Sequence, residues 1–223
     1  PGEAEIAALR ERVGWERITV DREAGVLRKT RGDVVADLSA IAPGFAADQV
    51  AELLEARGYD QYLVEVGGGE LRARGRRLDG EPWRVAIERP DPTTRAIQQV
   101  IALRYGAMAT SGDYRNYYEV GGERVSHTID PRDGHPIRHD LASVSVLHES
   151  AMYADALATA LNVLGPEAGY RMAEYLELAA CFIVRKDPEG FEIHATPAFA
   201  PLLEAEAEKV ERAEKAEETE EAR

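Results

Sequence analysis

The chain has 223 residues, of which 41 are Asp or Glu and 27 are Lys or Arg, so its formal net charge is −14 at pH 7. With 44% hydrophobic and 30% charged residues, the composition is that of a globular protein and excludes collagen-like, coiled-coil and fully disordered chains. The acidic excess argues against nucleic acid as a partner, because phosphate binding depends on clustered Lys and Arg. No apolar run approaches the ~20 residues that cross a bilayer.

The predicted elements begin with a short amphipathic segment at 6–15. Strands are expected at 18–20, 61–66, 71–74, 83–87, 97–103, 117–120, 143–147 and 181–185. Helices are expected at 44–57, 151–164 and 167–177, where Gly58 ends the first and Gly165-Pro166 separates the other two. Because several strands follow one another without intervening helices, we expect an α+β fold with mixed or antiparallel sheets flanked by helices.

Two regions are distinguished by composition. Residues 1–200 are expected to form one domain, and residues 201–223 an acidic tail that is helical or disordered, since it is rich in Glu and has no apolar face after Val210. The single cysteine, Cys181, lies in an apolar run and is expected to be a buried, inert thiol.

Asp155 and Thr159 are four residues apart within the predicted helix 151–164. This spacing places a carboxylate and a hydroxyl on one helix face, about one turn apart. Both are hard oxygen ligands of the kind that Mg²⁺ binds together with substrate phosphates. The alternative is a polar stripe on an amphipathic helix, in which the Thr159 hydroxyl bonds to the carbonyl four residues earlier.

His127 precedes the turn Asp130-Pro131-Arg132-Asp133-Gly134. A strand that carries a histidine into such a loop can present the imidazole to a ligand, although an exposed or core histidine has the same pattern. The other four histidines have no metal-ligand spacing and are assigned structural roles.

Three further segments are candidate ligand loops. Gly67-Gly68-Gly69 follows a predicted strand and lets backbone approach a phosphate, but it lacks the GxGxxG spacing and opens no helix, so a Rossmann site is rejected. Ser111-Gly112-Asp113-Tyr114 is interpreted as a tight turn. The segment from Asp37 to Gly44 leads into the first long helix, whose N-terminus can receive phosphate oxygens.

Taken in order, these segments resemble the ApbE family of FAD:protein FMN transferases, over roughly residues 18–199. The resemblance rests on five stretches of sequence in the family's order and spacing. They are Asp37–Asp48, Val66–Gly68, Thr110–Tyr118, Ser126–Pro136 and Ala154–Thr159.

The resemblance implies a Mg²⁺-dependent enzyme that splits FAD and attaches FMN through a phosphoester bond to a Thr or Ser of a partner protein. The side chains of Asp155 and Thr159 and the carbonyl of Ala40 would then be metal ligands. Contacts to FAD would come from three positions, and the family's catalytic histidine would be His127. The FAD-contacting positions are Asp37, Pro43 and Ile129.

The chain departs from the family pattern at several positions. Pro43 stands where relatives carry Lys or Glu, Asp133 replaces a Thr before the turn glycine, and Gly69 is an extra residue beside the usual glycine pair. Relatives also extend further at the N-terminus, so we expect the chain alone to bind FAD weakly and to associate with other copies or with a partner segment.

Two other functions stay open on the sequence. An FAD pyrophosphatase would use the same metal and break the same bond with water as acceptor, and a scaffold that binds flavin without turnover would make neither product. For the transferase, the resemblance implies an acceptor subunit of a membrane redox complex and a periplasmic or inner-membrane-anchored location.

Overall fold

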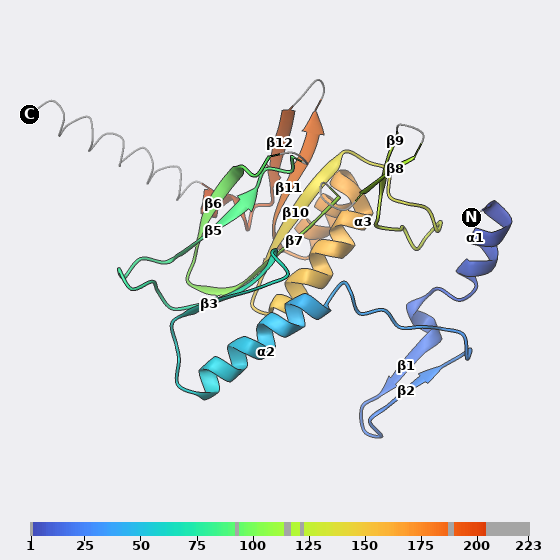
Figure 1. Ribbon diagram of the computed structural model, residues 1–223, viewed down its shortest axis with the longest axis horizontal. Helices are drawn as coiled ribbons and strands as arrows, with labels where there is room; N and C mark the ends of the chain where they lie inside the picture. Colours follow the sequence, from blue (N-terminus) through green and yellow to red (C-terminus); the bar gives the residue numbers. More distant parts are fainter. Residues whose placement is uncertain (1, 92–93, 114–116, 121–122, 187–189, 204–223) are drawn as a thin grey trace, which may run out of the picture. The chain divides into compact units, whose positions relative to one another are not determined.

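A six-stranded antiparallel sheet forms the centre of the fold (Figure 1). The computed structural model describes residues 2–91, 94–113, 117–120, 123–186 and 190–203. These residues divide into a large unit, Ser39–Asn116 with His139–Arg223, and a small unit, Pro1–Leu38 with Tyr117–Arg138. The expected α+β class is confirmed.

The central sheet belongs to the large unit and has the strand order β12-β11-β10-β7-β4-β3. Its strands are β3 (Tyr62–Val66), β4 (Glu70–Arg74), β7 (Tyr105–Gly112), β10 (Leu141–His148), β11 (Ala179–Lys186) and β12 (Gly190–Ala195). The sheet is completed by pairing across long connections, since β4 pairs with β7 and β7 with β10.

Each face of this sheet is covered by a different layer (Figure 1). Helices α2 (Ala42–Ala56) and α3 (Ala151–Tyr175) pack on one face, where Ala107 and Ala109 of β7 leave room for close approach. The hairpin of β5 (Trp83–Glu88) and β6 (Ile97–Leu103) contributes to the apolar cluster on the other face, which Met108 joins. Alternate residues of one strand therefore supply both cores.

Cys181 lies in the cluster on the hairpin side and is buried, as predicted. Burial raises the pKa of this thiol to about 12, because the low-polarity core disfavours the thiolate. The side chain therefore acts as a small apolar group.

The break predicted between two helices is confirmed, because α3 consists of two helical segments that meet at a kink at Gly165. The chain leaves helical geometry only at Gly165, with φ 83° and ψ −178°, and then resumes. Pro166 has no N–H for the Asn162 carbonyl, and His139 Nε2 donates to that carbonyl at 2.8 Å instead. An external histidine thus satisfies the acceptor that the proline leaves open.

The small unit consists of short elements. They are α1 (Glu3–Arg10), the 3₁₀ turn η1 (Trp15–Arg17), and the hairpins β1 (Ile18–Asp21) with β2 (Val26–Lys29) and β8 (Tyr117–Val120) with β9 (Glu123–Ser126). Among its described residues few side chains are buried, Ile6, Val34 and Ile137 being the apolar ones.

The eight predicted strands are all present, with bounds shifted by a few residues at most. Four strands were not predicted: β2, β7, β9 and β12. No helix in the described part of the chain is long and apolar enough to cross a membrane. Pro201–Leu203 of the predicted tail are helical, and residues 204–223 lie outside the described residues.

Candidate functional site

Asp155 lies near the start of α3, where the helix faces α2. Its side chain is only 5% exposed, and its Oδ2 accepts a hydrogen bond of 3.0 Å from the backbone N–H of Gly44. Burial raises the pKa of Asp155, and the Gly44 N–H opposes that shift. The carboxylate is therefore anchored at one oxygen by the first turn of α2.

The Gly44 position explains how α2 and α3 come so close. A Cβ at residue 44 would lie 2.3 Å from the Ala151 carbonyl oxygen and 2.8 Å from the Asp155 Cβ. Any side chain would push the two helices apart, so glycine at this position is a condition for the contact between Gly44 and Asp155.

Asp48, one turn further along α2, holds the N-terminus of α3. Its carboxylate accepts hydrogen bonds from Ser150 Oγ at 2.6 Å, the Ala151 N–H at 2.9 Å and the Met152 N–H at 3.0 Å. A carboxylate at this end of a helix satisfies free N–H groups and complements the helix dipole. Asp48 thus fixes the turn of α3 that immediately precedes Asp155, a role that the sequence analysis did not assign.

Thr159 follows Asp155 by one turn of α3, and its Oγ1 lies 3.1 Å from Ser111 Oγ on β7. Its partner is thus on the sheet, whereas the alternative had Thr159 bonded to its own helix. The tight turn expected at 111–114 is wrong at its start, because Ser111 and Gly112 belong to β7 and pair with β10. Tyr114 lies outside the described residues.

Ala40 and Pro43 lie just before and inside the first turn of α2. Pro43 suits that position because it fixes a helical φ and needs no N–H partner. The Ala40 carbonyl, the Asp155 carboxylate and the Thr159 hydroxyl all belong to the large unit. Their chemistry, one carboxylate with neutral oxygens, fits a hard cation that retains water or phosphate oxygens. Within the described residues no group of three His, Cys, Asp or Glu side chains could hold a metal.

Glu70, the first residue of β4, is a second acidic group near this site that the sequence analysis did not single out. Burial and then the negative charge of Asp155 raise the pKa of Glu70 to about 7. In the sequence, Glu70 is marked only by its position directly after the three-glycine turn. Many exposed hairpins share this pattern, so it does not indicate a functional residue.

The remaining predicted residues, Asp37, His127 and Ile129, belong to the small unit. His127 is exposed and comes directly after β9, so it is not on a strand as expected. Its Nε2 lies 3.5 Å from the Thr128 hydroxyl. Asp37 is exposed in the segment before α2, and Ile129 is 48% exposed and forms an isolated bridge with Pro136.

The loop after His127 is ordered by its own polar groups. Asp130 accepts hydrogen bonds from the Arg132 backbone and guanidinium, and the Asp130 N–H donates to the His135 carbonyl at 2.8 Å. Asp133 accepts from the His135 N–H at 2.8 Å. Asp133, which stands where the family pattern has Thr, therefore stabilises the turn in which it lies.

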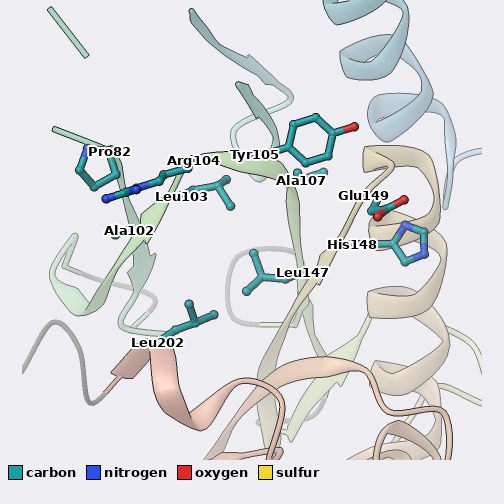
Figure 2. A pocket seen from close by; sticks show the side chains of 11 residues that line it. Pro82, Ala102, Leu103, Arg104, Tyr105, Ala107, Leu147, His148, Glu149 and Leu202 are labelled. Atoms are coloured by element: carbon teal, nitrogen blue, oxygen red, sulfur yellow. The ribbon is translucent and has the colours of Figure 1, made fainter. Parts of the chain in front are cut away.

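An apolar cavity of about 730 Å³ lies elsewhere in the large unit, where β6 turns into β7 (Figure 2). Leu103, Leu147 and Leu202 line it, with Tyr105 and His148 at one side (Figure 2). None of the residues predicted for the site lines this cavity.

Comparisons with known proteins agree with the resemblance. Residues 1–182 match the profile of the ApbE family. The chain is 45% identical over 207 residues to the FAD:protein FMN transferase of Haemophilus influenzae and 40% identical over 208 residues to that of Escherichia coli K12. In each case the match covers 92% of this chain and 59% of the relative, so the chain spans about 60% of the length of these curated relatives.

Solved structures give the same result. The flavin transferase ApbE from Vibrio cholerae matches with a TM-score of 0.80 and 41% identity, over 91% of this chain and 63% of that one. The apo form of Pseudomonas stutzeri flavinyl transferase ApbE matches with a TM-score of 0.80 and 43% identity, over 91% and 61%.

Proposed function

This chain belongs to the ApbE family, and on that basis we propose that it transfers FMN from FAD to a Thr or Ser hydroxyl of a partner protein, with Mg²⁺ as its metal. The observation that carries the proposal is the buried Asp155, held by the Gly44 N–H one helix turn from Thr159. Relatives named FAD:protein FMN transferase support the reaction.

The metal-binding half of the proposed site consists of Asp155, Thr159 and the Ala40 carbonyl. When bound by these residues, Mg²⁺ would supply Lewis-acid chemistry that offsets negative charge on a diphosphate. The protein's part is to present these oxygens in a fixed arrangement. The Gly44 N–H orients the carboxylate, and Ser111 orients the Thr159 hydroxyl.

In the transfer step, the acceptor hydroxyl oxygen forms a bond to the phosphorus of the FMN half of FAD. The bond from that phosphorus to the bridging oxygen breaks, and AMP carries the electron pair away. The hydroxyl proton passes to a base, and we assign this role to His127, because an imidazole accepts protons efficiently near neutral pH.

Flavin contacts are proposed for Asp37, Pro43 and Ile129. Pro43 is a short, apolar side chain, so it can pack against a ligand but offers it no hydrogen bond or charge. We therefore propose that Pro43 contributes packing, and no polar contact, to the binding of FAD.

The acceptor is proposed to be a subunit of a membrane redox complex, and the protein is proposed to be periplasmic or anchored to the inner membrane. Both rest on the family resemblance alone. Fractionation of cells that express the natural protein, with detection in periplasmic and membrane fractions, tests the location.

The reaction is tested by incubating the chain with FAD, Mg²⁺ and a Thr-containing acceptor domain and looking for flavin fluorescence on the denatured acceptor in a gel. Covalent fluorescence that disappears without Mg²⁺ supports the transferase. FMN and AMP without a labelled acceptor would indicate a pyrophosphatase, and neither product a scaffold.

A further inference from the structure

We infer that Glu70 contributes a second carboxylate to the divalent-cation site of Asp155, an inference that rests on the proposed function.

The register of β3 and β4 directs Glu70 toward the helices. Residues opposite one another in an antiparallel pair share a face, and Glu70 is opposite Val66, which packs in the cluster beneath α2. The next residues of β4 on that face, Arg72 and Arg74, form ion pairs with Asp48 and Glu55 of α2. Residues 70, 72 and 74 of β4 thus face α2, and Glu70 is the first of them along the strand.

The Glu70 carboxylate lies beside the first turn of α2. A Cβ on Gly67 would meet Glu70 Oε2 at 3.0 Å and the Pro43 Cβ at 3.8 Å, so both groups border the same point above the glycine turn. The adjacent residue, Gly44, donates to Asp155. The start of α2 therefore links Glu70 to the proposed metal ligand.

Glu70 is partly accessible to solvent. Glu70 and the glycines 67–69 line a polar cleft of about 630 Å³. Glu70 is therefore only half-buried, whereas Asp155 is almost fully buried.

The charges around Glu70 lack compensation. Unlike Arg72 and Arg74, it forms no ion pair within the described part of the chain, and the two charges that act on it, from Asp155 and Glu65, are both negative. A half-buried carboxylate whose charged form is disfavoured by a neighbouring negative charge is stabilised when a divalent cation binds beside it.

The test measures Mn²⁺ binding to the full chain by electron paramagnetic resonance, with Mg²⁺ as competitor and no flavin. Glu70→Gln should weaken Mn²⁺ binding by roughly 10-fold, the range expected for groups that support metal ligands. The metal-free variant should melt at the same temperature as the wild type or higher, because a repulsion is removed. Glu70→Asp, which keeps the charge on a shorter side chain, should bind with intermediate affinity.

Two control variants separate this inference from the proposed function. Glu174→Gln removes the same charge from an exposed position near the C-terminal end of α3 and should leave affinity nearly unchanged, whereas Asp155→Asn should abolish binding. If Asp155→Asn abolishes binding and Glu70→Gln does not weaken it, only the role of Glu70 is overturned. If wild type and Asp155→Asn bind Mn²⁺ alike, or neither binds it, the proposed metal site falls as well.

Discussion

The large and small units hold the residues proposed for function by different means. In the large unit, Asp155 and Gly44 lie where two helices pack on a buried sheet face. In the small unit, His127 is exposed, and its neighbourhood is ordered by hydrogen bonds within one loop. Packing fixes the first group of residues, and local turn chemistry fixes the second.

This difference predicts whether substituting a residue changes stability, activity or both. A residue fixed by packing affects stability as well as function, because its neighbours form the core. A residue on an exposed loop can change the chemistry and leave the fold unaffected. Activity and stability should therefore respond together in the large unit and separately in the small one.

The largest effect is expected for Asp155→Ala, which removes the carboxylate of the proposed metal site. Metal assistance supplies several kcal/mol to a transition state, so Mg²⁺-dependent flavin transfer should fall by at least about 10³-fold. The measurement is the rate of acceptor flavinylation over a range of Mg²⁺ concentrations. Activity at the wild-type level at low Mg²⁺ would contradict the assignment.

His127→Asn should lower turnover by about 10²–10⁴-fold, the contribution of a general base. Because His127 is exposed in the small unit, the unfolding midpoint in urea should not change. His194→Asn, at another exposed histidine, serves as the matched control. A variant that binds FAD poorly but turns over bound FAD normally would make His127 a binding residue.

Asp48→Ala should destabilise the large unit by about 2–3 kcal/mol, because the N-terminus of α3 loses its acceptor. Glu52→Ala, one turn later on α2 and exposed, should change stability by less than about 0.5 kcal/mol. Urea unfolding of both variants tests this. Equal stabilities would mean that Asp48 does not fix α3.

His139→Ala should cost about 1–2 kcal/mol, since it leaves the Asn162 carbonyl without its donor at the Pro166 break. His139→Gln, which restores an N–H donor, should recover part of the loss. The free energy of unfolding of the two variants is the measurement, and no difference between them would assign the loss to packing rather than to the hydrogen bond.

The smallest effect concerns pH. The pKa of Glu70 is raised to about 7 from its ordinary 4.5, so the folded state binds the proton more tightly than the unfolded state. Stability from this group is thus present below about pH 4.5 and is lost as the pH rises to about 7. Without metal, Glu70→Gln should gain melting temperature relative to wild type over this window. A constant difference from pH 4 to 8 would contradict the shift.

Much of the fold could be predicted because the strands and helices of the large unit have clear apolar patterns. The strand β7 was missed because its small residues, in Gly106-Ala107-Met108-Ala109, carry no β-branched signal, and their role depends on the helices that pack on them. The kink in α3 was predicted because Gly165-Pro166 interrupts a helix, whereas the donor from His139 to the Asn162 carbonyl could not be predicted, because His139 is distant in sequence.

The residues of the proposed site could be predicted less completely than the fold. Helical spacing indicated Asp155 and Thr159, since both lie on one continuous element. Asp48 and Glu70 could not be recognised, because what distinguishes them is a contact or a charge from a residue distant in sequence. The roles of Asp37, Ile129 and His127 stay predictions that rest on the family resemblance.

The pairing of β7 with β10 has a consequence for how such proteins can diversify. Gly112 is opposite Ser143, so the chain leaves the sheet and returns to it at neighbouring positions, with the segment 117–138 of the small unit in between. The histidine loop is thus an excursion from a β-hairpin. Evolution or an engineer could exchange this excursion while the scaffold that carries Asp155 is inherited unchanged.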